Sequence, residues 1–101
     1  MAIMMTSEAA GLTPDLYKNI AAVIEPRMQV APGFILHTAH ATPDGMRIVE
    51  FWESKAESDR FFAQHIRPNL PPGIHPKRKI QELEGMYGSR LNGELGLVAG
   101  S

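Results

Sequence analysis

Hydrophobic and polar residues alternate along several short stretches of the chain, and between them apolar residues recur at helical spacing. Alternation with a period of two is typical of half-buried strands, and spacings of three and four are typical of amphipathic helices. The predicted strands are residues 3–7, 34–41, 47–53 and 77–86, and the predicted helices are residues 14–25 and the segment between Ser54 and Pro68.

Both predicted helices begin at sequences that can cap a helix. Thr13 can accept hydrogen bonds from free backbone N–H groups, and Pro14 suits the first helical position, where no donor is needed. Ser54 and Glu57 form a capping box at the start of the second helix. Pro26 disfavours helical geometry at the preceding residue, so the first helix is predicted to end there.

The order of these elements predicts an α+β, ferredoxin-like βαββαβ fold. Such a fold has a four-stranded antiparallel sheet with both helices on one face. The third predicted strand is apolar on both faces, because Val49 and Phe51 alternate with Ile48 and Trp52. Since the helices cover only one face, we expect a second copy of the chain to cover the other and form a homodimer.

Composition restricts the classes of partner. A chain of 101 residues is one domain, and its net charge of −1 gives no electrostatic preference for nucleic acid or an anionic membrane. The absence of cysteine excludes disulfides, thiolate metal sites and a cysteine nucleophile. We therefore expect a small-molecule substrate as the partner, with no nucleic acid and no membrane.

The two ends of the sequence carry no targeting or spanning signal of the usual kinds. The first residues lack a basic region followed by a long apolar run, and no stretch approaches the ~20 apolar residues of a membrane span. A cytoplasmic location is therefore expected. Glycines are frequent near the C-terminus, so we expect a folded domain at residues 1–88 and a Gly-rich tail at residues 89–101.

The predicted hairpin of the second and third strands carries the strongest candidate site. A tight turn at residues 42–45 would place His37 opposite Glu50 and Ile35 opposite Trp52, with these side chains on one face. A carboxylate beside an imidazole fixes its tautomer and raises its basicity, which suits a general base. The alternative is a cross-strand pair that only satisfies two polar groups.

The same hairpin carries a family resemblance. The sequence P-G-F ahead of His37, the D-G turn, the segment V-E-F-W-E-S and an aromatic pair in the second helix resemble antibiotic biosynthesis monooxygenases, a group of dimeric α+β barrels. The resemblance covers residues 3 to about 86 and implies a His and an acidic residue at the positions of His37 and Glu50. Because this superfamily also includes heme degraders, isomerases and cyclases, the function must be argued from the site.

Aromatic side chains would complete a ligand cavity. The resemblance implies that Trp52 lines it, where its flat ring and N–H donor would bind substrate. Tyr17 in the first helix and Phe61, Phe62 and His65 in the second would form the opposite wall. Aromatic residues at helical spacing are more often core residues, so a structural role is the alternative for each.

No metal and no cofactor are expected. A metal site needs three or four converging ligands, and His37 and His40 lie on opposite faces of the predicted hairpin. No nucleotide-binding motif supports a flavin or nicotinamide. Heme degraders of the resembling superfamily use a Trp, a second-helix His and a first-strand Asn. Trp52 and His65 are present at a different spacing and the Asn is absent, which leaves heme as a minor alternative.

The leading hypothesis is a small cofactor-independent enzyme. It would be a monooxygenase acting on an aromatic or polyketide-like small molecule, with His37 as the base and Glu50 orienting it. One alternative is a non-catalytic, small-ligand-binding or stress-related dimeric domain, in which the pair is structural. The other is a cyclase or isomerase that uses the same base without oxygen. The sequence does not separate these hypotheses.

Overall fold

The computed structural model describes residues 2–88, so the predicted tail at residues 89–101 lies outside the described part of the chain. In chain order the elements are β1 (Ile3–Ala10), α1 (Pro14–Gln29), β2 (Phe34–Ala41), β3 (Gly45–Trp52), α2 (Lys55–Phe61), the π-helical turn η1 (Phe62–Ile66), the 3₁₀ turn η2 (Arg67–Asn69) and β4 (Lys77–Glu82). The predicted βαββαβ order is confirmed.

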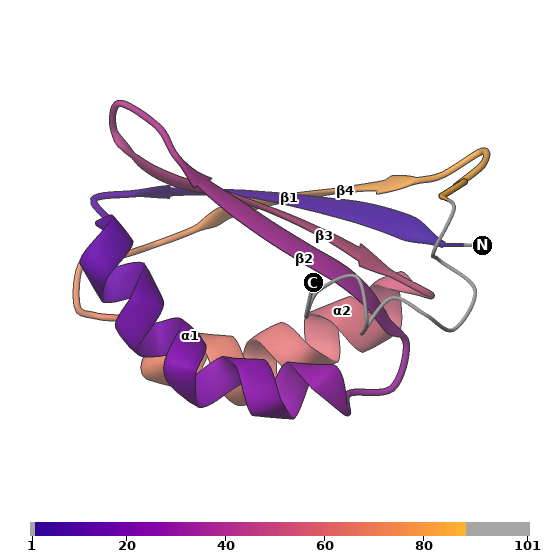
Figure 1. Cartoon of the computed structure of the whole chain (residues 1–101), viewed down its shortest axis with the longest axis horizontal. Coiled ribbons are helices and arrows are strands. Elements are labelled where there is room, and N and C mark those ends of the chain that lie inside the picture. Colours follow the sequence, from indigo (N-terminus) through magenta and orange to yellow (C-terminus); the bar gives the residue numbers. More distant parts are fainter. Residues whose placement is uncertain (1, 89–101) are drawn as a thin grey trace.

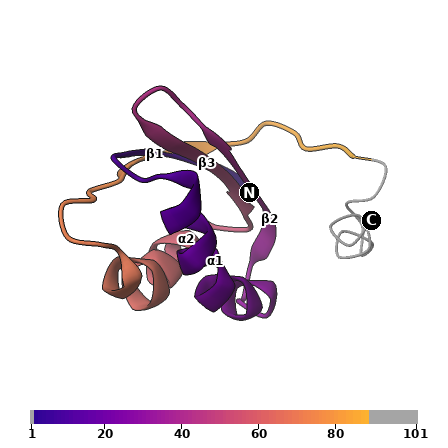
Figure 2. The same cartoon turned by 60° about the vertical axis from the view of Figure 1, so that its left-hand side comes forward.

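The four strands form one antiparallel sheet in the order β2-β3-β1-β4. Both helices lie on the same side of this sheet, with α1 and α2 next to each other beneath it (Figures 1 and 2). The ferredoxin-like architecture predicted from the sequence is therefore confirmed. No helix within residues 2–88 is long and apolar enough to span a membrane.

Helix α1 continues to Gln29, past the end that Pro26 predicted. Pro26 has no backbone N–H, so the carbonyl of Ala22 lacks its usual helical hydrogen bond. Ala22 is exposed, so water can satisfy that carbonyl. The last turn is favoured because Met28 is buried in the core one turn after Ile24. Burial of this side chain outweighs the local preference against helix before proline.

The strand ends follow from the pairing of the ladder. β1 runs on to Ala10 because that residue pairs with Gly45 at the start of β3. At the other end of β1, Ile3 pairs with Glu82 of β4. β4 ends at Glu82 and does not reach residue 86 as predicted, because Ile3 is the first residue of β1 and only Ala2, which accepts a hydrogen bond from Leu83 N, precedes it among the described residues.

The hairpin register is confirmed at the candidate site and wrong at its open end. His37 pairs with Glu50 as predicted, but a β-bulge at Ile35 places Phe34 opposite Trp52. The predicted pairing of Ile35 with Trp52 is thus incorrect. The extra residue turns Phe34 toward the helices, where its ring meets that of Trp52 at 5.5 Å between centroids in a T-shaped arrangement.

The core lies between the sheet and the two helices. Every second residue of β1 from Ile3 to Ala9 is buried, and Trp52 at the end of β3 is only 1% exposed. On the opposite face of the sheet, Met4, Leu36 and Val49 surround Phe51, and all four side chains are partly exposed. Neither helix covers this second face (Figure 1).

Candidate functional site

A chain of four side chains runs from helix α1 across the helix-facing side of the sheet. Tyr17 Oη lies 2.6 Å from His37 Nε2, and His37 Nδ1 lies 2.8 Å from Glu50 Oε2. The second carboxylate oxygen of Glu50 accepts a hydrogen bond of 2.9 Å from Trp52 Nε1. The predicted contact between His37 and Glu50 is present.

The sheet register explains how these residues meet. Glu50 and Trp52 are two residues apart on β3, so both side chains point toward the helices. His37 is the cross-strand partner of Glu50 on β2. Tyr17 lies on the inner side of α1, and its ring stacks on that of His37 with 6.0 Å between centroids and 10° between planes.

The environment of Tyr17 keeps its hydroxyl protonated. Burial raises the pKa of Tyr17, and the negative charges of Glu50 and Glu25 raise it further. A protonated Tyr17 donates to His37 Nε2 when the imidazole is neutral, so the imidazole proton resides on Nδ1 and is donated to Glu50. The arrangement therefore sets one tautomer of His37 and leaves its Nε2 as a proton acceptor.

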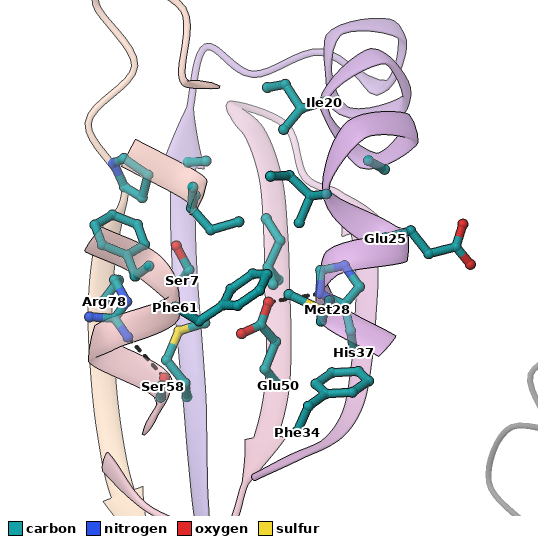
Figure 3. A pocket seen from close by; sticks show the side chains of 18 of the residues that line it. Ser7, Ile20, Glu25, Met28, Phe34, His37, Glu50, Ser58, Phe61 and Arg78 are labelled. Carbon is teal, nitrogen blue, oxygen red and sulfur yellow. Dashed lines mark hydrogen bonds and ion pairs between the residues drawn. The ribbon is translucent and has the colours of Figure 1, made fainter. Parts of the chain in front are cut away.

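A cavity of about 550 Å³ opens beside this chain of residues. Tyr17, His37 and Glu50 line one side. Apolar side chains of the sheet and of both helices form most of the remaining wall, among them Ile20, Met28, Phe34 and Phe61 (Figure 3). The volume lies within the range of about 300–1,000 Å³ that is usual for small-molecule sites. A largely apolar cavity with a few polar groups suits a small aromatic ligand.

The side of the cavity farther from His37 carries a second polar group, Arg78, which was not among the residues predicted for the site. Arg78 of β4 donates to Asp59 and to Ser58, each at 3.0 Å, and its guanidinium lies 4.5 Å from the centre of the Phe62 ring. Its Nε is buried and has no hydrogen-bond partner within the described residues. Ser7, which also lines the cavity, adjoins Arg78 in the sheet (Figure 3).

Asp59 anchors Arg78 in this position. Burial alone would raise the pKa of Asp59, but hydrogen bonds and charge interactions with Lys55 and Arg78 outweigh it, so the net pKa is lowered. Asp59 therefore stays ionised and holds the guanidinium beside the cavity. The alternation along β4 could have indicated this position. Arg78 and Ile80 are two residues apart on the strand, so both face the side of the sheet where Ile80 packs against the core.

Some of the residues that the sequence predicted for substrate binding line the cavity, and others do not. Phe61 and Phe62 line the cavity together with Tyr17. Trp52 does not, because it is buried behind Glu50 and packs its ring against that of Phe61 at 5.5 Å. His65 does not line the cavity either, since its ring contacts Phe61 at 4.8 Å from η1. The expectation that Trp52 and His65 form its wall is not met.

Within residues 2–88, no cluster of three or more His, Asp or Glu side chains is placed to hold a metal ion. His40, the other histidine of the hairpin, lies on the opposite face of the sheet beside Arg47, away from the cavity.

One curated protein resembles the chain in sequence. Tetracenomycin-F1 monooxygenase from Streptomyces glaucescens is 27% identical over 73 residues. The match covers 72% of this chain and 64% of that protein, so the chain spans less than two-thirds of the relative's length. No family model matches the chain.

Solved structures share the fold. SnoaB, a cofactor-independent oxygenase from Streptomyces nogalater, superposes with a TM-score of 0.63 at 14% identity, covering 84% of this chain and 94% of that one. The ActVA-Orf6 monooxygenase of Streptomyces coelicolor, solved in complex with nanaomycin D, gives 0.52 at 20% identity, covering 85% and 89%. The chain has the fold of these oxygenases, so the fold that the sequence resemblance implied is confirmed.

Proposed function

We propose that this protein is a cofactor-independent monooxygenase that acts on an aromatic or polyketide-like small molecule. The observation that carries the proposal is the imidazole of His37, held by the Glu50 carboxylate at 2.8 Å on the wall of a largely apolar cavity. The proteins of similar fold support it, because SnoaB is a cofactor-independent oxygenase and ActVA-Orf6 is a monooxygenase solved in complex with the ligand nanaomycin D.

The proposed chemistry begins with loss of a proton from an activated C–H or phenolic O–H group of the substrate. His37 is the base, and the imidazolium that forms is stabilised by the buried Glu50 carboxylate, which is 7% exposed. The electron-rich anion then reacts with dioxygen, forming a C–O bond, and the imidazolium proton completes a hydroperoxide. Loss of water from a hydroperoxide at a former CH₂ carbon leaves a carbonyl, so one O₂ gives one carbonyl and one water.

The second polar wall supports recognition of an oxygen-bearing aromatic ligand. Arg78 of β4 and Ser7 of β1 lie on the other side of the cavity from His37. The Nε–H of Arg78 has no hydrogen-bond partner among residues 2–88. A carbonyl or ionised oxygen of a planar ligand would find hydrogen-bond donors there. The apolar walls between the two polar sides keep water from the anion.

The direct test is oxygen consumption with anthrone-type and quinol-type compounds. We expect one O₂ consumed per carbonyl formed, in purified protein treated with a chelator to exclude contaminating metal. Ring closure or isomerisation of the same compounds without oxygen uptake would assign the site to a cyclase or isomerase. Tight binding with no conversion of any kind would favour the non-catalytic ligand-binding domain.

We further propose a homodimer that buries the second face of the sheet. The apolar side chains Met4, Leu36, Val49 and Phe51 form one patch there, and antiparallel sheets with two apolar faces are normally covered on both. The patch is bordered by charged side chains such as Arg47 and Glu8, which form an ion pair.

Light scattering at micromolar concentration should therefore give twice the chain mass of 11.1 kDa. Phe51→Arg should give the single-chain mass, because it places a charge at the centre of the patch. Val30→Arg is the matched control, since Val30 is an exposed apolar residue away from the sheet. A single-chain mass for the unaltered protein would refute the dimer.

A further inference from the structure

Both nitrogens of the His37 ring are already engaged. Nδ1 lies 2.8 Å from Glu50, and Nε2 lies 2.6 Å from the hydroxyl of Tyr17. A substrate that enters the cavity therefore does not meet a free imidazole nitrogen. The atom placed to receive its proton has to be sought one residue further along the chain of hydrogen bonds.

The hydroxyl oxygen of Tyr17 has the required capacity. Tyr17 lines the cavity, and its raised pKa, which burial and the charges of Glu50 and Glu25 produce, keeps the O–H intact. That O–H points at His37 Nε2, because the neutral imidazole can only accept there. A tyrosine hydroxyl carries one donor and two acceptor lone pairs, so the oxygen can still accept a proton from the cavity side.

We propose that Tyr17 is the catalytic residue that takes the proton from the substrate, and that His37 acts through it. As the substrate C–H or O–H bond breaks, a new O–H bond forms on Tyr17. The original Tyr17 proton moves at the same time to His37 Nε2. The products of the step are the substrate anion, neutral Tyr17 and the imidazolium of His37, so protons and charge balance. This proposal rests on the proposed function of the site as a base.

The charge distribution favours this relay over ionisation of Tyr17 itself. A lasting phenolate would be partly buried and close to the carboxylates of Glu50 and Glu25, and burial first and these charges second raise the pKa of Tyr17. In the relay the positive charge ends on His37, against Glu50 at 2.8 Å. The positive charge of the His37 imidazolium is stabilised by the negative charge of Glu50, and Tyr17 is neutral before and after the step.

The competing mechanism is displacement of Tyr17, so that the substrate reaches His37 Nε2 directly. The structure opposes it, because the Tyr17 ring is stacked on that of His37 and is carried by α1 within the folded layer. The two mechanisms predict opposite effects of removing the hydroxyl. Tyr17→Phe blocks a relay, whereas it frees Nε2 for a direct transfer.

The test is an anaerobic titration with dithranol, an anthrone-type compound whose anion absorbs at longer wavelength than the neutral form. Without oxygen the proton transfer is observed alone. We expect the unaltered protein to bind dithranol as the anion. Tyr17→Phe should bind it with a similar Kd but form the anion more slowly, and its kcat for oxygen consumption should fall by about 10²-fold, the lower end for general base catalysis.

Tyr87→Phe is the matched control, because Tyr87 is 97% exposed and is the second of the two tyrosines in the chain. It should leave both anion formation and turnover unchanged. Circular dichroism and Tm would establish that Tyr17→Phe is folded, which is expected because the ring that stacks on His37 is retained.

A measurement on the unaltered protein avoids any question of folding. Direct transfer of a carbon-bound proton to Nε2 moves no proton that exchanges with solvent, whereas the relay also moves the exchangeable hydroxyl proton of Tyr17. Anion formation should therefore be slower in heavy water. Equal rates in light and heavy water would overturn the relay.

The outcomes separate the relay from the proposed function. Anion formation and oxygen uptake by Tyr17→Phe at the rates of the unaltered protein would overturn the relay and leave His37 as a direct base. Anion formation that depends on Tyr17, with no oxygen uptake, would support the relay and overturn monooxygenation. Bound dithranol that stays neutral in the unaltered protein would overturn both.

Discussion

Replacing His37 with alanine should lower kcat for oxygen consumption by about 10²–10⁴-fold, the usual contribution of a general base. Both forms of proton transfer, direct or through Tyr17, end with the proton on His37 Nε2. The Glu50 carboxylate is a poor replacement for the imidazole, because it is 7% exposed and one of its oxygens is held by the N–H of Trp52. KM should change much less, since apolar side chains form most of the cavity wall.

The matched control for this variant is His75→Ala. His75 is exposed in the segment between η2 and β4 and does not line the cavity, so its loss should leave kcat unchanged. Steady-state oxygen consumption over a range of substrate concentrations separates kcat from KM. If His37→Ala turns over at the rate of the unaltered protein, proton removal does not involve His37 and the proposed base is wrong.

The fold could be predicted because its signals are local. The capping residues Thr13 and Ser54 accept the hydrogen bonds expected of them, from Leu16 N and Glu57 N. The alternation along the strands placed every element in the correct order. What failed were boundaries set by distant partners. Helix α1 passes Pro26 because Met28 is buried by residues from other elements, which no local rule contains.

The candidate site could be predicted where a cross-strand register determines it. His37 faces Glu50 because the turn sets the pairing of β2 and β3, and that pairing is readable from the hairpin sequence. The contact of Tyr17 with His37 depends instead on how α1 lies across the sheet. The position of Arg78 across the cavity from His37 depends on β1 lying between β3 and β4. Neither the Tyr17 contact nor the position of Arg78 could therefore be read from the hairpin sequence.

The role of Trp52 changes most between sequence and structure. The resemblance placed it in the cavity wall, where its loss would weaken ligand binding. In the structure it lies in the core between Phe34 and Phe61, at 5.5 Å from each ring, and it donates to Glu50. Under the proposed mechanism it is a positioning residue, because it holds the carboxylate that in turn orients His37.

Trp52→Ala should accordingly lower the free energy of unfolding by about 3–5 kcal/mol, the usual cost of removing a buried aromatic side chain. The loss combines a cavity between Phe34 and Phe61 with an unpaired oxygen of Glu50. Urea unfolding followed by circular dichroism measures it, because Trp52 is the only tryptophan and its fluorescence would be lost. Trp52→Phe is the matched variant, since it keeps most of the ring and removes only the N–H donor, so its loss should be smaller. If Trp52→Ala unfolds at the same urea concentration as the unaltered protein but binds dithranol weakly, Trp52 belongs to the cavity wall after all.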